Sequence, residues 1–296
     1  MSVSQLADLV ASGRTYVIAE IGQNHQGDPE IAKRLIREAK LCGVNAVKSQ
    51  KRDIRTMLTP EQYAKPYNSP HSFGRTYGEH REALELSLDT WAELMAYAWE
   101  LEIDFFASPW DIPSARVLKE LDCPIIKIAS ASLTQRPMLQ EIAGYGKPVI
   151  LSTGMSTLEE IDGAVDALQG ADVYLLQCTS AYPAEFSTVN LRAMATLKKR
   201  YDLPIGLSGH HRGIAVDAAA VALGAQIIER HFTLDRTWKG SDHAASLEPP
   251  GLSRLVRDMR AVESAMGDSE KGVLQCELPA RSKLRGPVTV AQTAAA

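Results

Sequence analysis

The sequence predicts an α/β protein whose eight parallel strands close into a (β/α)8 (TIM) barrel. Short apolar runs rich in β-branched residues recur along the chain, and a segment with helical apolar spacing follows each of them. The chain has 296 residues. Eight strand–helix units with short connections suit a barrel of about 250 residues better than a doubly wound open sheet, which is the competing fold.

Each predicted element rests on its local pattern. The strands are expected at residues 16–21, 46–49, 103–107, 124–128, 148–152, 173–178, 204–207 and 225–230. The helices are expected at residues 28–41, 88–101, 113–121, 138–145, 158–168, 191–200, 214–223 and 250–266. Together they predict a barrel domain over residues 1–285 and a short C-terminal tail over residues 286–296.

One long polar stretch interrupts this alternation. Residues 52–82 are rich in Pro, Gly, Tyr and His and show no strong periodicity. We interpret them as a long loop, because a loop of this length in a compact domain usually has a task such as covering a site. A loosely ordered surface insertion is the alternative.

Composition excludes several classes of function. A net charge of −4 provides no electrostatic basis for binding nucleic acid or a membrane surface. No run of about 18 apolar residues exists, and the N-terminus lacks the pattern of a secretion signal. Four widely spaced cysteines form no CxxC pair, which is typical of reduced thiols, so we expect a cytoplasmic protein.

Polar side chains follow the predicted strands at the points where the strands end. In a (β/α)8 barrel the catalytic residues gather at this C-terminal end. Asp242 lies on the loop beyond the last strand. The other candidates at strand ends are Glu20, Lys48, Gln50, Ser108, Lys127, Ser130, Ser152, Tyr182, Ser208, His210 and His231.

Two lysines, Lys48 and Lys127, lie inside otherwise apolar strands. A buried ammonium group needs an anionic partner, because an unpaired charge is costly in the interior. Each lysine could pair with a barrel carboxylate such as Glu20 or Glu229. Alternatively, the lysines and the neighbouring serines hold a bound phosphate and carboxylate, with ammonium charge and hydroxyl groups as the binding groups.

His210 and His231 follow neighbouring predicted strands, so both imidazoles can reach one point. Two imidazoles with oxygen ligands and open positions suit a divalent metal ion, with Mn²⁺ or Mg²⁺ the leading candidates and Fe²⁺ or Zn²⁺ as alternatives. For His71, His80 and His211 a structural role is the simpler interpretation.

Several segments, taken in order, resemble the sialic acid (nonulosonic acid) synthases. They include AEIGQNHQGD, AVKSQ, IKIAS, ILSTGM, LQCTSAYP, GLSGHH and ERHFTLD. The segments RTYGEH and TWKGSDHAASLEPP are most similar to the animal-type branch, which acts on a hexosamine 6-phosphate, whereas the bacterial branch acts on the free sugar. The resemblance runs from about residue 14 to residue 285.

The resemblance implies a reaction and a role for each candidate. Enzymes of this family have a (β/α)8 barrel and condense phosphoenolpyruvate with N-acetylmannosamine, its 6-phosphate or a related sugar, releasing phosphate with C–O cleavage. By this likeness, His210 and His231 hold the metal, and Glu20 moves protons near the attacked carbon. The phosphoenolpyruvate positions match Lys48, Lys127, Ser130, Ser152 and Ser208, and the sugar or metal positions match Gln50, Ser108, Tyr182 and Asp242.

Three departures from the family pattern affect these expectations. Gly209 precedes the first metal histidine where many members have Asp, and Ser132 stands where an acid is usual. The family usually carries a C-terminal antifreeze-like domain that reaches across a homodimer to the N-acetyl group, and the sequence ends before it. We therefore hypothesise that the enzyme is relaxed towards, or prefers, a sugar that lacks the N-acetyl group, such as mannose 6-phosphate. The resemblance also implies a homodimer, although its usual partner-swapped domain is missing.

Two other functions remain as alternatives. Another phosphoenolpyruvate-dependent synthase of a seven- or eight-carbon 3-deoxy sugar acid would share the site and differ in its acceptor. The segment TWKGSDHAASLEP argues against it. A non-catalytic carbohydrate-binding barrel would not need the lysines, serines and both histidines together.

Overall fold

The chain forms a closed barrel of eight parallel strands in sequential order, which confirms the predicted (β/α)8 fold. The computed structural model describes residues 4–285. The strands are β1 (Tyr16–Gly22), β2 (Ala46–Lys51), β3 (Asp104–Pro109), β4 (Ile126–Ile128), β5 (Val149–Ser152), β6 (Val173–Cys178), β7 (Ile205–Gly209) and β8 (Ile227–His231). Pairing of β1 with β8 closes the barrel, with Glu20 opposite His231.

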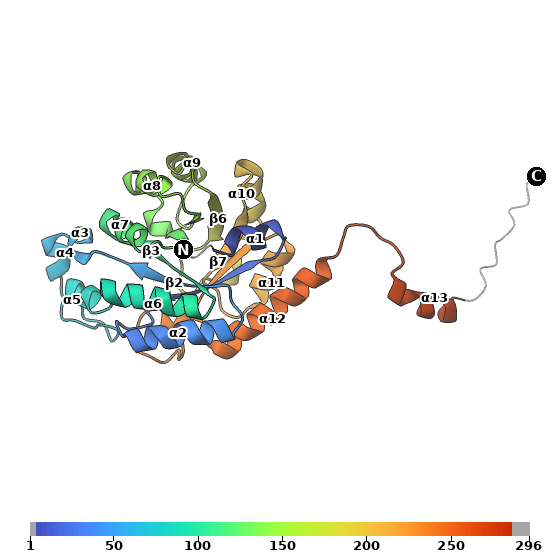
Figure 1. Cartoon of the computed structure of the whole chain (residues 1–296), viewed down its shortest axis with the longest axis horizontal. Helices are drawn as coiled ribbons and strands as arrows, with labels where there is room; N and C mark the ends of the chain where they lie inside the picture. The colour runs from blue at the N-terminus through green and yellow to red at the C-terminus, as the bar shows by residue number, and fades with distance from the viewer. Residues whose placement is uncertain (1–3, 286–296) are drawn as a thin grey trace, which may run out of the picture. The chain divides into compact units, whose positions relative to one another are not determined.

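The helices within residues 6–266 connect the strands and surround the barrel (Figure 1), and one further helix belongs to the second unit of the chain. They are α1 (Leu6–Ala11), α2 (Pro29–Leu41), α3 (Ile54–Met57), α4 (Pro60–Ala64), α5 (Tyr77–Glu82), α6 (Leu88–Glu100), α7 (Ile112–Glu120), α8 (Arg136–Ala143), α9 (Leu158–Ala167), α10 (Ala193–Tyr201), α11 (Ala215–Ala222), α12 (Pro249–Met266) and α13 (Leu278–Leu284). Short 3-10 helices are η1 (Ser130–Ser132), η2 (Phe186–Thr188), η3 (His243–Ala245) and η4 (Gln275–Glu277). Side-chain caps begin several helices; the Asp28 carboxylate accepts from the first turn of α2, for example.

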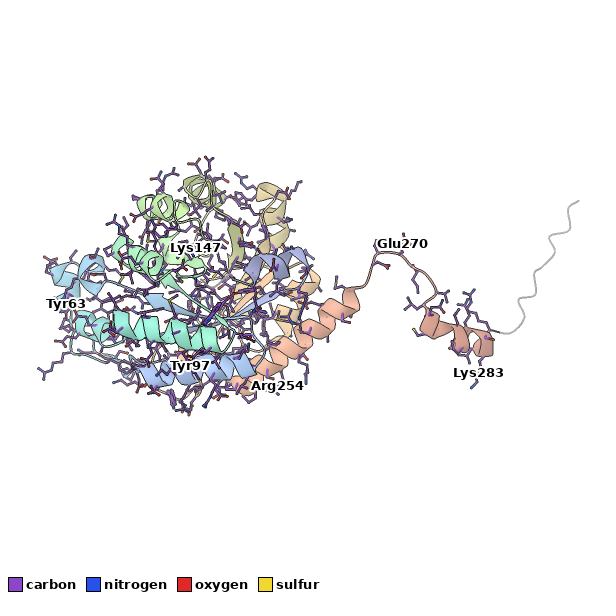
Figure 2. All side chains as sticks on the ribbon, viewed as in Figure 1. Tyr63, Tyr97, Lys147, Arg254, Glu270 and Lys283 are labelled. Carbon is purple, nitrogen blue, oxygen red and sulfur yellow. The ribbon has the colours of Figure 1, made fainter. Side chains whose placement is uncertain are left out.

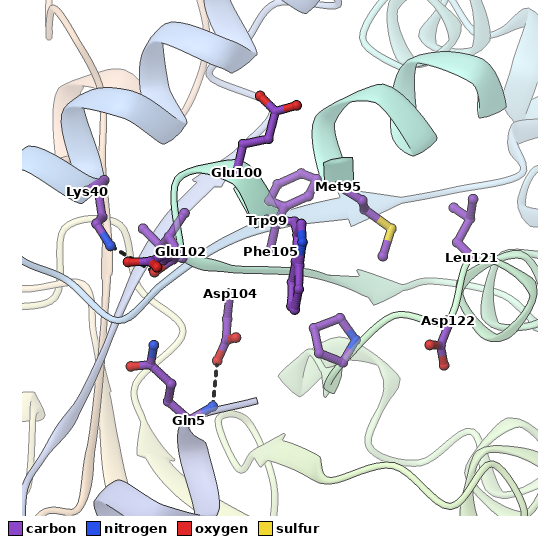
Figure 3. Close-up of a pocket in the computed structure, with 12 residues that line it drawn as sticks. Gln5, Lys40, Met95, Trp99, Glu100, Glu102, Asp104, Phe105, Leu121 and Asp122 are labelled. Atoms are coloured by element: carbon purple, nitrogen blue, oxygen red, sulfur yellow. Dashed lines mark hydrogen bonds between the residues drawn. The ribbon is translucent and has the colours of Figure 1, made fainter. Parts of the chain in front are cut away.

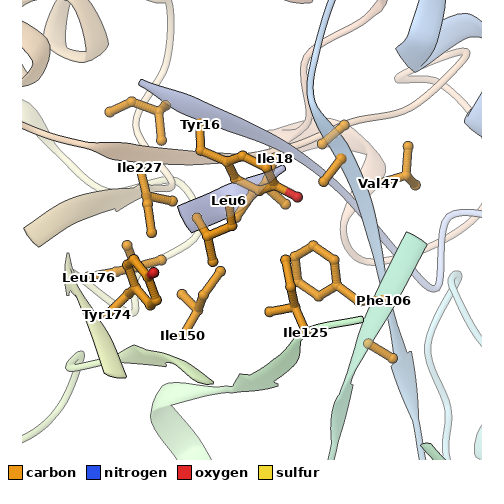
Figure 4. Packing of buried hydrophobic residues seen from close by; sticks show 14 of the residues in the cluster. Leu6, Tyr16, Ile18, Val47, Phe106, Ile125, Ile150, Tyr174, Leu176 and Ile227 are labelled. Atoms are coloured by element: carbon orange, nitrogen blue, oxygen red, sulfur yellow. The ribbon is translucent and has the colours of Figure 1, made fainter. Parts of the chain in front are cut away.

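The helix α1, which the sequence did not predict, closes the N-terminal end of the barrel. Its Leu6 is fully buried and packs among Tyr16, Ile18 and Tyr174 (Figure 4). The carboxylate of Asp104, at the start of β3, accepts hydrogen bonds from the Ser4 hydroxyl at 2.8 Å and from the Gln5 backbone N–H at 3.2 Å. Chemistry at the opposite, C-terminal end is therefore supported by a closed apolar base.

The insertion after β2 is more ordered than predicted. A long loop was expected over residues 52–82, and the structure has the helices α3, α4 and α5 there instead. Thr59 and Thr76 begin α4 and α5 with reciprocal capping boxes, which stabilise helices too short to form alone. Gly78 lies against the ring of Tyr63, since a Cβ at this position would come within 2.0 Å of it. Figure 2 labels Tyr63 on this insertion.

The strand β8 presents two kinds of chemistry on its two faces. Side chains alternate along a strand, so Glu229 and His231 face one side and Arg230 faces the other. The sequence predicted this strand over residues 225–230. The observed strand begins two residues later and ends one residue later, at His231. Arg230 contacts Asp217 of α11, outside the barrel. Glu229 and His231 therefore point into the barrel, where the candidate site lies.

The chain divides into two compact units, Met1–Ala265 and a second unit beginning at Met266. The division between these units lies before the domain boundary predicted after residue 285. The predicted boundary stays a prediction. Within the second unit the described residues form η4 and α13, and the predicted tail 286–296 lies outside the described residues. Among the helices of residues 4–285, none has both the length and the apolar composition that crossing a bilayer requires.

Candidate active site at the C-terminal end of the barrel

A cavity of about 270 Å³ lies at the C-terminal ends of the strands. Every site residue predicted from the sequence lines it except Asp242. Those residues are Glu20, Lys48, Gln50, Ser108, Lys127, Ser130, Ser152, Tyr182, Ser208, His210 and His231. Parallel strands bring their carboxyl ends to one edge, so residues far apart in the sequence meet here.

Two buried lysines form the floor of this cavity, and a serine accepts a hydrogen bond from each. Lys127 Nζ donates to Ser152 Oγ at 2.6 Å, and Lys48 Nζ donates to Ser108 Oγ at 3.2 Å. Carboxylates balance the ammonium charges. Lys48 contacts Glu20, and each lysine nitrogen lies 3.9 Å from Glu229 Oε2. The carboxylate pairing that the sequence left as an alternative is therefore present, and it leaves the ammonium groups on the cavity wall.

The two floor carboxylates have opposite pKa shifts. Burial, with repulsion from Glu229, raises the pKa of Glu20 above its usual range despite the charge of Lys48. Burial also acts on Glu229, but the charges of Lys127 and Lys48 outweigh it and hold the pKa of Glu229 below its usual range. Burial lowers the pKa of Lys127, and Glu229 only partly offsets this effect. Such paired environments are typical of functional sites.

The imidazoles of His210 and His231 meet on one side of the cavity, with ring centroids 5.3 Å apart. His210 Nδ1 lies 2.8 Å from the Thr179 carbonyl, which fixes the ring and leaves Nε2 available. His231 Nδ1 is buried without a hydrogen-bond partner among the described residues, and burial lowers the pKa of His231 to about 4. The ring is therefore neutral at pH 7, which is the form that binds metal ions.

The imidazole pair supplies only part of a metal site. Within residues 4–285 no group of three or more His, Cys, Asp or Glu side chains is arranged to hold a metal ion. A cation with two protein ligands would take its remaining ligands from substrate oxygens and water, as Mn²⁺ and Mg²⁺ commonly do. The predicted metal pair thus fits as a partial ligand set.

Asp242 lies at the edge of the cavity rather than in its wall. Its Oδ2 is 4.0 Å from His231 Nδ1, and its Oδ1 accepts a 2.6 Å hydrogen bond from Ser241. Burial acts to raise the pKa of Asp242, but the neighbouring His231, the Ser241 hydrogen bond and the charges of Arg52 and Arg81 outweigh it and hold this pKa below its usual range. Arg52 and Arg81 of the insertion segment are therefore close enough to act on this carboxylate.

Some lining residues were not selected from the sequence. Glu229 was named only as a possible lysine partner, and Cys178 was interpreted as a core thiol. Cys178 Sγ lies 4.0 Å from His210 Nδ1. Trp110 and Met155 carry no polar pattern that would have marked them. Ala129, Ala131 and Ser180 complete the wall.

The remaining histidines and Ser132 lie outside the cavity wall. His211 is buried against Asp217, and His243 Nδ1 lies 2.7 Å from the Thr233 hydroxyl, so both belong to the surrounding scaffold. His80 Nδ1 accepts from the Phe73 backbone N–H at 3.1 Å. Ser132 is fully buried, and its hydroxyl has no partner among the described residues.

A larger cavity of about 930 Å³ lies at the N-terminal end of the barrel (Figure 3). Several of its polar groups already have partners: Lys40 Nζ donates to the Glu102 carbonyl at 2.8 Å, and Asp104 accepts from the Gln5 backbone N–H at 3.2 Å. The partly buried Met95 and the exposed Trp99 border it. Volume alone therefore does not identify the reactive site, since polar groups converge at the other end.

Sequence comparison identifies relatives along most of the chain. The model of the NeuB family matches residues 35–271. N-acetylneuraminate-9-phosphate synthase of Mus musculus is 46% identical over 272 residues, covering 91% of this chain and 76% of the relative. N,N'-diacetyllegionaminic acid synthase of Campylobacter jejuni is 41% identical over 270 residues, covering 89% of this chain and 81% of the relative.

Structural comparison agrees with the sequence match. The N-acetylneuraminic acid synthetase of Leptospira borgpetersenii, solved with citrate, superposes with a TM-score of 0.79 at 34% identity, covering 91% of this chain and 92% of the other. The matched residues include most of the eight-stranded barrel and most of the residues that line the polar cavity. The chain therefore belongs to the NeuB family, whose members are phosphoenolpyruvate-dependent condensing enzymes.

Proposed function

We propose that this chain condenses phosphoenolpyruvate with the open-chain aldehyde of a hexose or hexosamine 6-phosphate of mannose configuration. The product is a nine-carbon nonulosonic acid 9-phosphate, and phosphate is released. The observation that carries the proposal is the placement of the buried Lys48 and Lys127 beside the His210–His231 pair in one cavity. The 46% identity to an N-acetylneuraminate-9-phosphate synthase favours the phosphorylated acceptor.

Phosphoenolpyruvate would bind at the floor of the cavity. Its phosphate and carboxylate need fixed positive charge, which Lys48 and Lys127 supply, and hydroxyl donors, which Ser130, Ser152 and Ser208 supply. Ser152 and Ser208 already hydrogen-bond to Lys127 and Glu229, so their orientation is set before the ligand arrives. Such fixed donors stabilise developing charge without reorganising during the reaction.

The sugar aldehyde would lie between this floor and the imidazoles. His210 and His231 would hold the divalent metal, which when bound supplies Lewis-acid polarisation of an aldehyde oxygen. The ring of Tyr182 lies 4.0 Å from that of His210 between centroids, so it covers the imidazole on the solvent side. Gln50 and Asp242 are placed to bind hydroxyl groups of the sugar; Gln50 Nε2 donates to Glu20 Oε1 at 2.9 Å.

Glu20 would move protons in this reaction. It is buried, contacts Lys48 and lines the cavity opposite His231. The enol carbon attacks the aldehyde carbon, and the aldehyde oxygen takes up a proton to become a hydroxyl. Water adds to the ester carbon with loss of a proton, and the C–O bond to phosphate then breaks as the ketone forms at that carbon. Glu20 would accept the proton from the attacking water, and the ammonium group of Lys48 would stabilise the negative charge that develops during the reaction.

The test is a sugar panel incubated with phosphoenolpyruvate and Mn²⁺. The acceptors are N-acetylmannosamine, mannose, their 6-phosphates, arabinose 5-phosphate and erythrose 4-phosphate. Phosphate release and a thiobarbituric assay for 2-keto-3-deoxy acids report turnover, and the reaction is repeated with a chelator. We expect the highest kcat/KM with a six-carbon 6-phosphate and loss of activity on chelation.

Each other outcome has a distinct meaning. Preference for the four- or five-carbon phosphate would make the protein a synthase of a shorter 3-deoxy sugar acid. A strong preference for the N-acetyl sugars would reject acceptance of mannose. Absence of product from every acceptor, with metal and phosphoenolpyruvate both bound, would overturn the proposed reaction.

A further inference from the structure

Two cationic side chains near the rim of the active-site cavity have no carboxylate partner among residues 4–285. Arg81 lies half-buried on α5 of the insertion, and Lys239 lies exposed in the loop between β8 and α12. Two other arginines of the insertion are paired with carboxylates: Arg55 lies 2.9 Å from Glu82, and Arg52 lies 3.3 Å from Glu85. An oriented cation without an anion is a candidate binding group for an anionic ligand.

Both cations are supported by neighbouring aromatic rings. The Arg81 guanidinium lies 5.0 Å from the centroid of Tyr77, whose hydroxyl it also binds at 2.7 Å. Lys239 Nζ lies 4.6 Å from the centroid of Phe73. The Tyr77 and Phe73 rings both flank the imidazole of His80, with centroids 6.3 and 6.0 Å from it. The two positive charges therefore stand on one continuous aromatic platform.

A chain of contacts connects Arg81 to the active-site cavity. Arg81 Nη1 donates to Gln23 Oε1 at 3.1 Å, and Gln23 Nε2 donates to Ser241 Oγ at 3.3 Å. Ser241 in turn donates to Asp242, which lies beside His231. These contacts link the platform, through Asp242, to His231 at the cavity.

The same two charges act on His80. Burial, with the charges of Arg81, Lys239 and Arg52, lowers the pKa of His80 to about 4. The imidazole is therefore neutral at pH 7, and the positive charge here comes from Arg81 and Lys239. Asp242 is the carboxylate of the cavity rim on this side, and its Oδ1 accepts a hydrogen bond from Ser241 rather than from either cation of the platform.

We propose that Arg81 and Lys239 form the subsite for the terminal phosphate of the sugar acceptor. The inference rests on the proposed function, because that reaction fixes the aldehyde end of the sugar near His210 and His231. The far end of a six-carbon chain then extends past Asp242 towards the insertion. A phosphate monoester dianion matches two unpaired cations, and arginine can bind it through two parallel N–H bonds. An unphosphorylated sugar offers these cations no counter-charge.

The test compares R81Q and K239Q with the wild type on N-acetylmannosamine 6-phosphate and on N-acetylmannosamine. We expect KM for the phosphorylated sugar to rise about 10- to 100-fold in R81Q, the range that loss of charged hydrogen bonds produces. KM for phosphoenolpyruvate and for the unphosphorylated sugar should change far less, because neither ligand carries a charge at this position. R81K should recover part of the loss. R55Q is the matched control, because Arg55 lies in the same insertion but is already paired with Glu82.

Direct binding separates this inference from the proposed reaction. Calorimetric titration of each sugar into wild-type protein and R81Q, in the presence of Mn²⁺, requires no turnover. Selective loss of 6-phosphate binding in R81Q supports the subsite even if no product forms. Equal affinity of R81Q and wild type for the phosphorylated sugar overturns it even if the wild type is active. An equal loss for phosphoenolpyruvate and both sugars also overturns it, because that pattern indicates a general structural or electrostatic effect.

Discussion

Arg230 Nη2 donates a 2.7 Å hydrogen bond to the backbone carbonyl of His211, which ties the end of β8 to the segment that follows β7. The guanidinium also contacts Asp217 and donates to the Gly213 carbonyl at 3.0 Å. His210 and His231 are the chain neighbours of His211 and Arg230. A buried ion pair on the outer face of the barrel thus sets the spacing of the two imidazoles on the inner face.

Replacing Arg230 should destabilise the fold strongly. In R230A the fully buried Asp217 loses its partner, which typically costs about 3–5 kcal/mol. Urea unfolding measures the change in the free energy of unfolding. The control is R254A on the exposed side of α12, where Arg254 binds only the Pro250 carbonyl (Figure 2). Similar unfolding free energies for R230A and R254A would contradict the structural role assigned to Arg230.

Removing the charge of Lys127 should impair binding of phosphoenolpyruvate. K127M keeps the approximate length of the side chain but removes the donor to Ser152 and the charge near Glu229. We expect kcat/KM for phosphoenolpyruvate to fall by at least about 100-fold. The matched control is K147M, which removes a surface lysine paired with Asp122. The assignment would be wrong if K127M retained the KM of the wild type.

Either active-site imidazole should be required for metal binding. H210Q and H231Q should each weaken Mn²⁺ binding by at least about 100-fold, because removing one of two protein ligands has a larger effect than disturbing its hydrogen-bond partner. Electron paramagnetic resonance of free Mn²⁺ measures this affinity without turnover. H243Q is the control, since His243 binds Thr233 instead. Unchanged Mn²⁺ affinity in both H210Q and H231Q would mean that the metal binds at another site.

Acid should destabilise the protein partly through His25. This buried side chain lies behind the β1 end, where burial and the charge of Arg52 lower its pKa from 6.5 to about 4. The unfolded state binds a proton below about pH 6.5, whereas the folded state does not until about pH 4. The stability from His25 is therefore present above pH 6.5 and is lost as the pH falls, by about 3 kcal/mol in total.

The measurement is urea unfolding at several pH values between 7 and 4. The slope of stability against pH should be shallower in H25Q than in the wild type, whatever the change in absolute stability. H71Q, which alters an exposed histidine, should keep the wild-type slope. A slope that H25Q leaves unchanged would assign the acid sensitivity to other groups.

The sequence predicted the barrel because burial on both faces leaves a strong pattern. Parallel strands such as β5 and β6 are nearly continuous apolar runs, and their helices show regular spacing. The short helix α1 was missed because only Leu6 of its six residues is buried, which is too little for periodicity to register. The insertion helices were missed because capping residues, rather than an apolar face, stabilise α4 and α5.

The sequence predicted which side chains meet in one cavity where position along a strand determines direction. Lys48 and Lys127 were noticed because charge inside an apolar strand is unusual, and His210 and His231 because they end neighbouring strands. Glu229 was undervalued because its sequence neighbours do not reveal that two ammonium groups approach it. The platform of Arg81 and Lys239 could not be predicted either, because 158 positions separate its two cations in the sequence and only tertiary folding joins them.

The charge balance of the cavity floor has a consequence for the order of binding. Lys48 and Lys127 are already matched by Glu20 and Glu229, so the floor is electrically neutral before any ligand arrives. A multiply charged enol ester would make this interior strongly negative unless a proton or a cation enters with it. Ester and cation should therefore bind with reciprocal thermodynamic linkage, each increasing the affinity of the protein for the other by the same factor.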